Sequence, residues 1–148
     1  MAQTTTAFNW CDIVIRLDNA VGTLTDVSGV TNKVDPEFSN EIGDFRTFAS
    51  NWAGRISCGQ DAAFSIDIYM STSTSEAWAI LKDWFFTQPS AKKTLQLDFP
   101  SGSSGGDRLQ CECVLESMDW SGKADEPAPT MVSLSVKPDG AVALSVIP

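Results

Sequence analysis

Residues 62–100 read AAFSIDIYMSTSTSEAWAILKDWFFTQPSAKKTLQLDFP, and this stretch decides the fold because its apolar period changes twice. Apolar residues first alternate with polar ones from Phe64 to Met70, which predicts a strand with one buried face. The period then becomes helical, and alternation returns from Leu95 to Phe99. The stretch therefore predicts a strand, a helix and a second strand in succession.

The predicted helix carries its own start and stop signals. Ser73-Thr74-Ser75-Glu76 matches a capping box, in which the first serine and the glutamate satisfy free backbone N–H groups. Gln88-Pro89 ends the helix because proline lacks an N–H and restricts the residue before it. Between these signals lies an apolar stripe that needs a sheet to cover it, and we call it the helix core stripe: Trp78, Leu81, Trp84 and Phe85.

Alternation elsewhere predicts further strands at 11–17, 55–58, 109–120, 132–136 and 142–146. Gly59-Gln60-Asp61 has turn chemistry, and Ile56 and Cys58 before it are expected to face inward. Pro138-Asp139-Gly140 predicts a turn that closes a final hairpin. The fold class that follows is mainly β, with two packed antiparallel sheets (a β-sandwich or a partly open barrel) and one flanking α-helix. We expect a single domain over residues 1–148.

The segment from 22 to 54 is predicted to be a long loop or short hairpin, because Asp35-Pro36 interrupts any strand there. Long loops that carry aromatic residues are often functional. Its large apolar residues either form an exposed contact surface or fold back onto the core, and they are Phe38, Ile42, Phe45, Phe48 and Trp52. Residues 1–9 are polar and threonine-rich, and we expect an arm that orders against a partner.

Composition excludes several functional classes. A formal charge of −9 argues against a surface that grips nucleic acid, though not against one that DNA passes without sticking. No apolar run is long enough to span a bilayer, and we expect neither a secretory signal nor membrane insertion. The four cysteines are expected to be small buried residues, and Cys111 and Cys113 are poorly placed for a disulfide.

No residue set predicts catalysis, so we expect no enzyme, no catalytic residues, no cofactor and no metal ligands. Histidine is absent, and no nucleophile or phosphate-loop motif occurs. Two carboxylate pairs, Asp125 with Glu126 and Asp67 with Asp98, could in principle act as glycosidase acids, but adjacent surface acids are mostly solvated. Loop carboxylates could form a calcium site, but no EF-hand spacing is present. A carbohydrate-binding β-sandwich module stays an alternative, with Trp10, Trp52 and Trp120 as sugar platforms.

The order of elements resembles the tail tube (major tail) proteins of tailed bacteriophages over residues 10–147. The resemblance runs through the aromatic loop, the Gly-Gln-Asp turn, the capped helix EAWAILKDWF (76–85), the glycine-serine loop after Pro100 and the final hairpins. It implies a structural virion protein that self-assembles into stacked rings, usually hexamers, as an acidic conduit for DNA ejection. It also implies a place in the virion tail after assembly in the host cytoplasm. The implied partners are copies of the chain, the tape measure, terminator and tip proteins, and double-stranded DNA that passes without specific binding.

The same resemblance implies roles for particular residues. Ring-to-ring contacts are expected in 22–54, with Phe38, Ile42, Phe45 and Phe48 as the candidate stacking interface, and in the arm 1–9. Candidate lumen residues lie on the polar strand faces and are Asp67, Asp98 and Glu112. The tube protein of a bacterial contractile injection machine and other tail or neck ring proteins stay open as alternatives.

Overall fold

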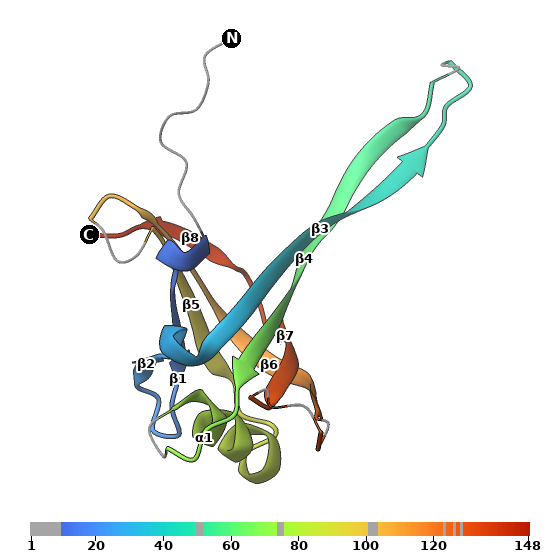
Figure 1. Ribbon diagram of the computed structural model, residues 1–148. Helices are drawn as coiled ribbons and strands as arrows, with labels where there is room; N and C mark the ends of the chain where they lie inside the picture. The colour runs from blue at the N-terminus through green and yellow to red at the C-terminus, as the bar shows by residue number, and fades with distance from the viewer. Residues whose placement is uncertain are drawn as a thin grey trace.

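One antiparallel sheet of eight strands makes up most of the protein (Figure 1). The computed structural model describes residues 10–49, 52–73, 76–100, 104–122, 124, 125, 127 and 129–148, so the predicted arm 1–9 lies outside the described residues. The strand order is β2-β1-β5-β6-β7-β4-β3, and β8 pairs with β6. The strands are β1 (Val14–Asp18), β2 (Leu24–Asp26), β3 (Thr31–Phe45), β4 (Gly54–Tyr69), β5 (Lys93–Phe99), β6 (Asp107–Ser121), β7 (Met131–Pro138) and β8 (Ala143–Val146).

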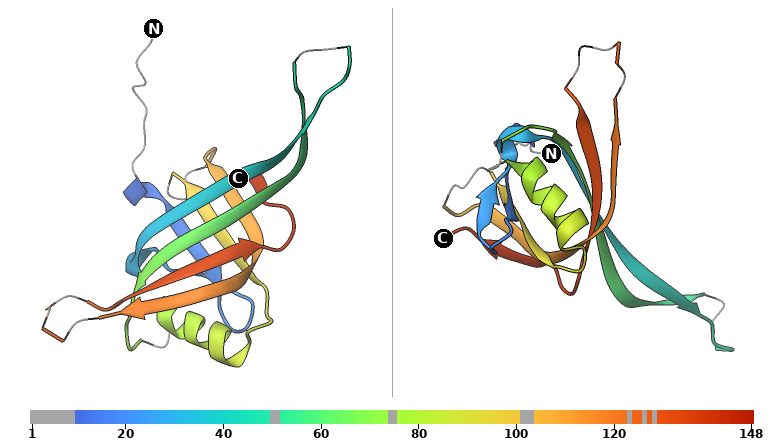
Figure 2. Two further views of the ribbon diagram at one scale, coloured as in Figure 1. Left: turned by 90° about the vertical axis from the view of Figure 1, so that its right-hand side faces the viewer. Right: turned by 90° about the horizontal axis from the view of Figure 1, so that it is seen from below.

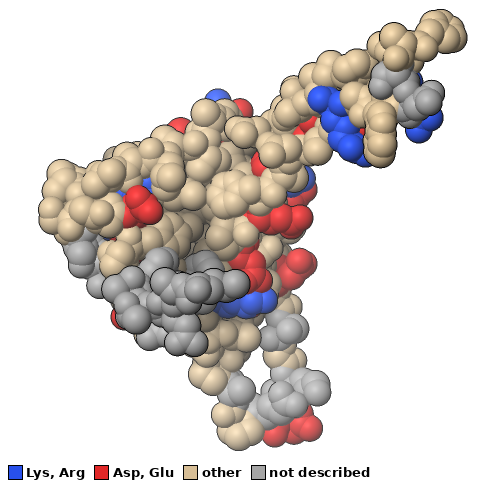
Figure 3. All heavy atoms as spheres, turned by 90° about the horizontal axis from the view of Figure 1, so that it is seen from above, with Lys and Arg blue, Asp and Glu red and all other residues tan. Residues whose placement is uncertain are grey.

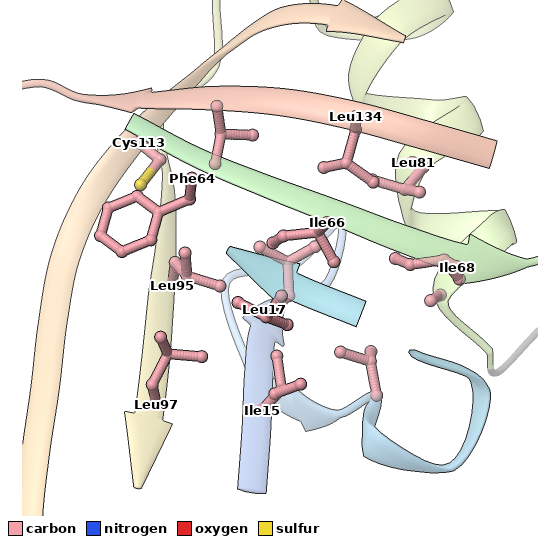
Figure 4. Close-up of a cluster of buried hydrophobic side chains, with 14 of the residues drawn as sticks. Ile15, Leu17, Phe64, Ile66, Ile68, Leu81, Leu95, Leu97, Cys113 and Leu134 are labelled. Carbon is pink, nitrogen blue, oxygen red and sulfur yellow. The ribbon is translucent and has the colours of Figure 1, made fainter. Parts of the chain in front are cut away.

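The sheet curls so that its two halves face each other across one apolar core (Figures 2 and 4). Alternate residues of each strand point inward, as Ile15 and Leu17 do on β1 and Phe64, Ile66 and Ile68 on β4. The mainly β fold with a helix is thus confirmed. A single sheet that stays open between β1 and β3 supplies both layers, which is the partly open barrel of the two predicted forms.

The helix covers one end of this core. It differs from the prediction in the residue at which it begins and in which side chains face the core. It comprises α1 (Ala77–Lys82) and a π-helical turn, η3 (Asp83–Thr87), and Glu76 rather than Ser73 occupies the N-cap position, without a side-chain cap bond. A π-helical turn has more residues than an α-turn and rotates those that follow. Leu81 and Trp84 are buried and Trp78 is partly buried, whereas Phe85, which lies within the π-helical turn and was placed in the helix core stripe, is exposed.

Of the two forms predicted for 22–54, the structure contains a hairpin, which is much longer than expected because β3 pairs with β4 from Thr31 to Phe45. The predicted turn at Gly59–Asp61 is wrong, since these residues continue β4. β2 and a short 3-10 helix, η2 (Ser28–Val30), precede the hairpin. Pro36 is tolerated within β3 because this strand lies at the edge of the sheet, where an absent N–H costs no ladder bond. Cys58 forms a bulge opposite Glu41 and Ile42, and both Ile56 and Cys58 are exposed rather than inward-facing.

Two further expectations are corrected. The strand at Ala143–Val146 pairs with Asp107–Gln110 of β6 and not with β7, so Pro138-Asp139-Gly140 joins strands that do not form a hairpin. Of the cysteines, only Cys111 and Cys113 are buried; Cys11 is exposed because it lies in the 3-10 helix η1 (Trp10–Asp12), before β1 begins.

Truncation of Trp84 tests whether the helix seals the core. Its side chain is fully buried and its Nε1 donates a hydrogen bond of 2.7 Å to the Ala91 carbonyl. We expect Trp84→Ala to lower the free energy of unfolding by about 3–5 kcal/mol, measured by urea denaturation followed by circular dichroism. Phe86→Ala is the matched control, since Phe86 is 60% exposed, and a similar loss in both variants would contradict this packing.

Candidate assembly surfaces

The outer half of the β3–β4 hairpin projects beyond the rest of the sheet (Figure 1). It exposes apolar side chains on both of its faces. β7 pairs with β4 only from Phe64 to Tyr69, so residues 54–63 have β3 as their one strand partner among the described residues. The strand alternation places Phe38 and Ile42 on the face that continues the core, and Phe45 and Ile56 on the opposite face. All four candidate stacking residues are exposed: Phe38 55%, Ile42 58%, Phe45 47% and Phe48 116%. Phe38 contacts the core through the ring of Phe64, with centroids 5.9 Å apart in an edge-to-face arrangement, and still leaves half of its side chain exposed.

The hairpin tip, which we define as the described residues of 45–54, is locally ordered by two contacts. The Phe45 ring lies directly over Gly54, where a Cβ would come within 2.3 Å of the ring. Asp44 and Arg55 pair across the strands at 3.3 Å. A two-stranded ribbon has little stability by itself in water, so a ribbon with apolar residues on both faces indicates a partner on each face.

The convex face of β3, β4, β7 and β6 is polar and carries more acidic than basic residues. Asp67 and Glu112 both lie on this face, as two of the three candidate lumen residues. Lys33 pairs with Asp35 at 2.7 Å, and Lys137 pairs with Glu116 at 3.0 Å. Seen from above, red acidic side chains gather on the body beside the hairpin, and blue basic ones lie on its outer part (Figure 3).

Asp98, the third candidate lumen residue, is fully buried and offers no exposed carboxylate, which a lumen position requires. Its Oδ1 accepts a hydrogen bond of 2.8 Å from Arg108 Nε, and its Oδ2 accepts one of 2.5 Å from Arg16 Nη1. The cluster ties β1, β5 and β6 together on the outer side of the sheet. Sequence alone missed it because strand register, and not local pattern, brings the two arginines to Asp98.

The two arginines also set the acidity of Asp98. Burial pushes its pKa upward, but the hydrogen bonds and charges of Arg108 and Arg16 outweigh burial and hold the pKa below its ordinary value. A carboxyl with a depressed folded-state pKa stabilises the fold above its unfolded pKa and loses that contribution as the pH falls. Asp98 is therefore structural in this arrangement.

A second feature missed from sequence is a mostly apolar pocket beside the helix. It has a volume of about 540 Å³ and lies between the helix and the end of β6. Trp78 and Trp120 form one wall, with ring centroids 6.0 Å apart in an edge-to-face arrangement. The lining residues are Met70, Trp78, Lys82, Asp83, Phe86, Thr87 and Trp120. The sequence indicated that Trp120 could be exposed, but no sequence pattern predicted that it would lie beside Trp78 of the helix.

Within the described chain, the strand set β6-β7-β4-β3 has a free edge on each side, in addition to the free edge of the short terminal strand β2. β3 has a partner on one side only, β4. β6 pairs with β5 through Cys113, so from Val114 to Ser121 only its β7 side is paired. Unpaired N–H and C=O groups on an exposed edge are a template for pairing with another chain.

Metal-binding groups and membrane-spanning helices were both considered for the described residues. These residues contain no group of three or more His, Cys, Asp or Glu side chains placed to hold a metal ion. None of the helices in the described ranges has the length and apolar character needed to cross a membrane.

Comparison with known proteins identifies the fold. No family model matches the chain, and no curated protein sequence matches it. Among solved structures, the tail of an empty gene transfer agent particle with C6 symmetry is similar, with a TM-score of 0.75, 17% identity and coverage of 94% of this chain and 99% of that one. The SPP1 tail tube gives a TM-score of 0.73 at 12% identity, covering 95% and 80% of the two chains.

An extracellular contractile injection system, the PVC sheath-tube complex in the extended state, is similar to the same degree. Its TM-score is 0.73 at 10% identity, covering 97% of this chain and 94% of that one. The protein therefore has the fold shared by tail tubes and the tubes of contractile injection systems, as the resemblance in sequence order predicted.

Replacing Asp98 tests the structural role of the buried cluster. We expect Asp98→Asn to cost about 3 kcal/mol of unfolding free energy, because two partly buried guanidiniums lose their counter-charge. The wild-type melting temperature should also fall as the pH drops below about 4, the ordinary aspartate value, and the variant should show a weaker dependence. Thermal melts between about pH 6 and 2 measure both effects.

The control for this experiment is Asp139→Asn, which removes an exposed ion pair with Lys92 and should cost less than about 1 kcal/mol. Equal losses in the two variants would contradict the assignment of Asp98 to the fold.

Proposed function

We propose that this protein assembles into stacked rings that form a tube. The observation that carries the proposal is the outer half of the β3–β4 hairpin, which has apolar side chains on both faces that the described part of the chain does not cover. The shared fold with the gene transfer agent tail, the SPP1 tail tube and the PVC tube supports it. The C6 symmetry of the first of these makes rings of six copies our specific proposal.

Edge pairing closes the ring in this proposal. The free edge of β3 and the free edge of β6 from Val114 to Ser121 lie at opposite sides of the strand set β6-β7-β4-β3. Pairing of one copy's β3 with the next copy's β6 removes both edges. Such a contact is heterologous, and it gives a closed ring when the rotation between copies completes a circle.

The hairpin links one ring to the next. Residues 54–63 extend the ribbon by about 30 Å beyond the last pairing with β7, at the usual rise of an antiparallel strand. Phe38, Ile42, Phe45 and Phe48 then become buried against copies in the neighbouring ring. The arm 1–9 is assigned a second ring-to-ring contact, from the family resemblance alone.

The convex face of the strand set β6-β7-β4-β3 lines the lumen in this proposal. Its acidic excess repels DNA phosphates, so that double-stranded DNA slides without being held. Asp67 and Glu112 remain the proposed lumen residues, and Asp98 is no longer one because it is buried. The lumen location, the tape measure, terminator and tip proteins as partners, and assembly in the host cytoplasm before incorporation into the virion tail all belong to the proposal.

A tube of a contractile injection machine is the second candidate, because the PVC tube shares the fold to the same extent. The two candidates differ in cargo and in the presence of a sheath, and an acidic lumen favours passage of DNA. Trp52 and Trp120 are exposed as a carbohydrate-binding module would need, but their positions at the hairpin tip and beside the helix suit contacts between copies.

Removing the outer hairpin should separate folding from stacking. In this variant Asn-Gly replaces residues 40–60 and joins the paired residues Ser39 and Asp61 through a two-residue turn. Wild-type protein should form rings and tubes in electron micrographs as its concentration rises, and the variant should stay folded and form no tubes. A wild-type monomer at every concentration, or a variant that still forms tubes, would overturn the proposal.

Reversing charge on the convex face should make the tube hold DNA. Asp67→Lys with Glu112→Lys raises the formal charge from −9 to −5, since each substitution replaces a negative with a positive charge. Tubes assembled with double-stranded DNA should then retain nuclease-protected DNA at about 50 mM salt and release it as the salt rises. Wild-type tubes should retain little.

The matched control is Asp107→Lys with Asp125→Lys, which makes the same change in net charge away from that face. Equal protection of DNA by both variants would show that the convex face does not line the lumen.

A further inference from the structure

We propose that the pocket beside the helix is the receptor for the hairpin tip of another copy of this chain. This inference rests on the proposed function, since it names the surface that receives the stacking hairpin. It concerns two exposed apolar features of the described chain: the tip, with Phe45, Phe48 and Trp52, and the pocket wall of Trp78, Phe86 and Trp120.

The two features lie at opposite ends of the molecule, so they cannot meet within one copy. Figures 1 and 2 show the hairpin leading away from one end of the body and the helix closing the other end, and the views agree on this arrangement. Copies related by a shift along this direction bring the tip of one to the helix end of the next. The tip and the pocket are different surfaces of one chain, so a contact between them is heterologous. Such a contact can repeat from copy to copy without limit along an axis.

The chemistry of the two surfaces is complementary. The pocket has about 540 Å³ of space, which admits an aromatic side chain, and its walls offer aromatic edges for packing. Phe86 is 60% and Trp120 52% exposed, and Phe48 and Trp52 at the tip are more exposed still. Contact between copies would remove all four side chains from water.

Charge agrees with this docking. Arg46 follows Phe45 at the tip, and Asp83 lines the pocket. Among the described residues, no donor reaches Asp83 Oδ2, although this atom is shielded from water. An arginine brought to the pocket beside an aromatic anchor supplies a donor to this carboxylate, and arginine and aromatic residues are the usual anchors of protein interfaces.

A competing receptor lies at the base of the hairpin. A groove of about 400 Å³ there is lined by Phe38, Ala62, Leu109, Val142 and Leu144 among others. It lies on the face that continues the core and at the hairpin end of the molecule, so a shift along the molecule does not bring it to the tip. It therefore suits a neighbour within the ring better than one in the next ring.

Crosslinking in assembled tubes tests the contact directly. The full chain carries Cys11→Ser and Cys58→Ser, which removes the two exposed cysteines, and then Thr47→Cys at the tip with Thr87→Cys in the pocket lining. These positions leave every aromatic residue in place. A short bismaleimide should give a ladder of covalent oligomers, because each copy carries both a tip and a pocket.

Two controls decide the outcome. Each single-cysteine variant should give no ladder, and Thr47→Cys with Leu144→Cys should give none if the groove at the hairpin base is not the receptor. Tubes that form without a Thr47–Thr87 ladder, or a ladder that appears only with Leu144, would overturn this contact and leave the proposed function standing. Wild-type protein that forms no tubes would overturn both.

A second measurement covers the case in which the cysteine pair prevents assembly. Phe86→Ala should raise the protein concentration needed for tube formation by roughly tenfold or more, because it truncates an aromatic anchor. Val21→Ala, at a side chain that is 83% exposed and belongs neither to the tip nor to the pocket lining, should leave that concentration unchanged. An unchanged concentration for Phe86→Ala would also overturn the contact.

Discussion

A single sheet has to bury its own apolar face, and the rest of this structure depends on how it does so. The strands alternate, so one face of the sheet is apolar from β3 to β1. Curling brings the two halves of that face together but leaves one end of the core open. The helix covers this end with the buried side chains of Leu81 and Trp84. The buried pairing of Asp98 with Arg16 and Arg108 holds the strands of one half together from the outer side. The core is therefore complete within one chain.

Curling without closure leaves features that a complete core does not need. The sheet stays open beside β3, so β3 keeps a free edge. β6 extends beyond its partner β5, so the part of β6 after Cys113 has a free edge on that side. The hairpin runs on after β7 has ended, with apolar residues on both faces. None of these features stabilises the isolated chain, and each exposes groups that pair readily with another copy. A core that is complete within one chain, together with free strand edges and an exposed apolar hairpin, is the combination that a subunit of an assembly requires.

Local pattern was sufficient where burial is decided within one element. Alternation predicted the strands around Phe64–Ile68, Leu95–Phe99 and Leu109–Trp120, and the helical period predicted α1. It failed where pairing between distant strands overrides local chemistry. Gly59-Gln60-Asp61 has the composition of a turn, yet it continues β4 because fifteen residues of β3 lie alongside.

The same limit explains the errors among individual residues. Asp98 has the alternation of a solvent-facing residue, and only register shows that Arg16 and Arg108 cover it. Phe85 has the spacing of a core residue, but it lies within a π-helical turn and is exposed. The composition of the segment 22–54 left open whether its aromatic residues form a contact surface or fold back onto the core, and only the family resemblance indicated a stacking surface. The proposed receptor for these residues was not predicted, because a pocket such as that of Trp78 and Trp120 exists only after folding.

Two kinds of contact between copies have different geometric consequences, and a tube needs both. Pairing of β3 with a neighbour's β6 rotates each copy relative to the last and ends when the circle is complete. Docking of a hairpin tip at the far end of another copy shifts that copy along an axis and has no natural end. Because the edges and the tip are different parts of one chain, the two proposed contacts are independent of each other, and neither involves the core. A closed lateral contact combined with an open axial one produces a hollow polymer of fixed width and variable length, with the convex acidic face of the sheet available to line its interior.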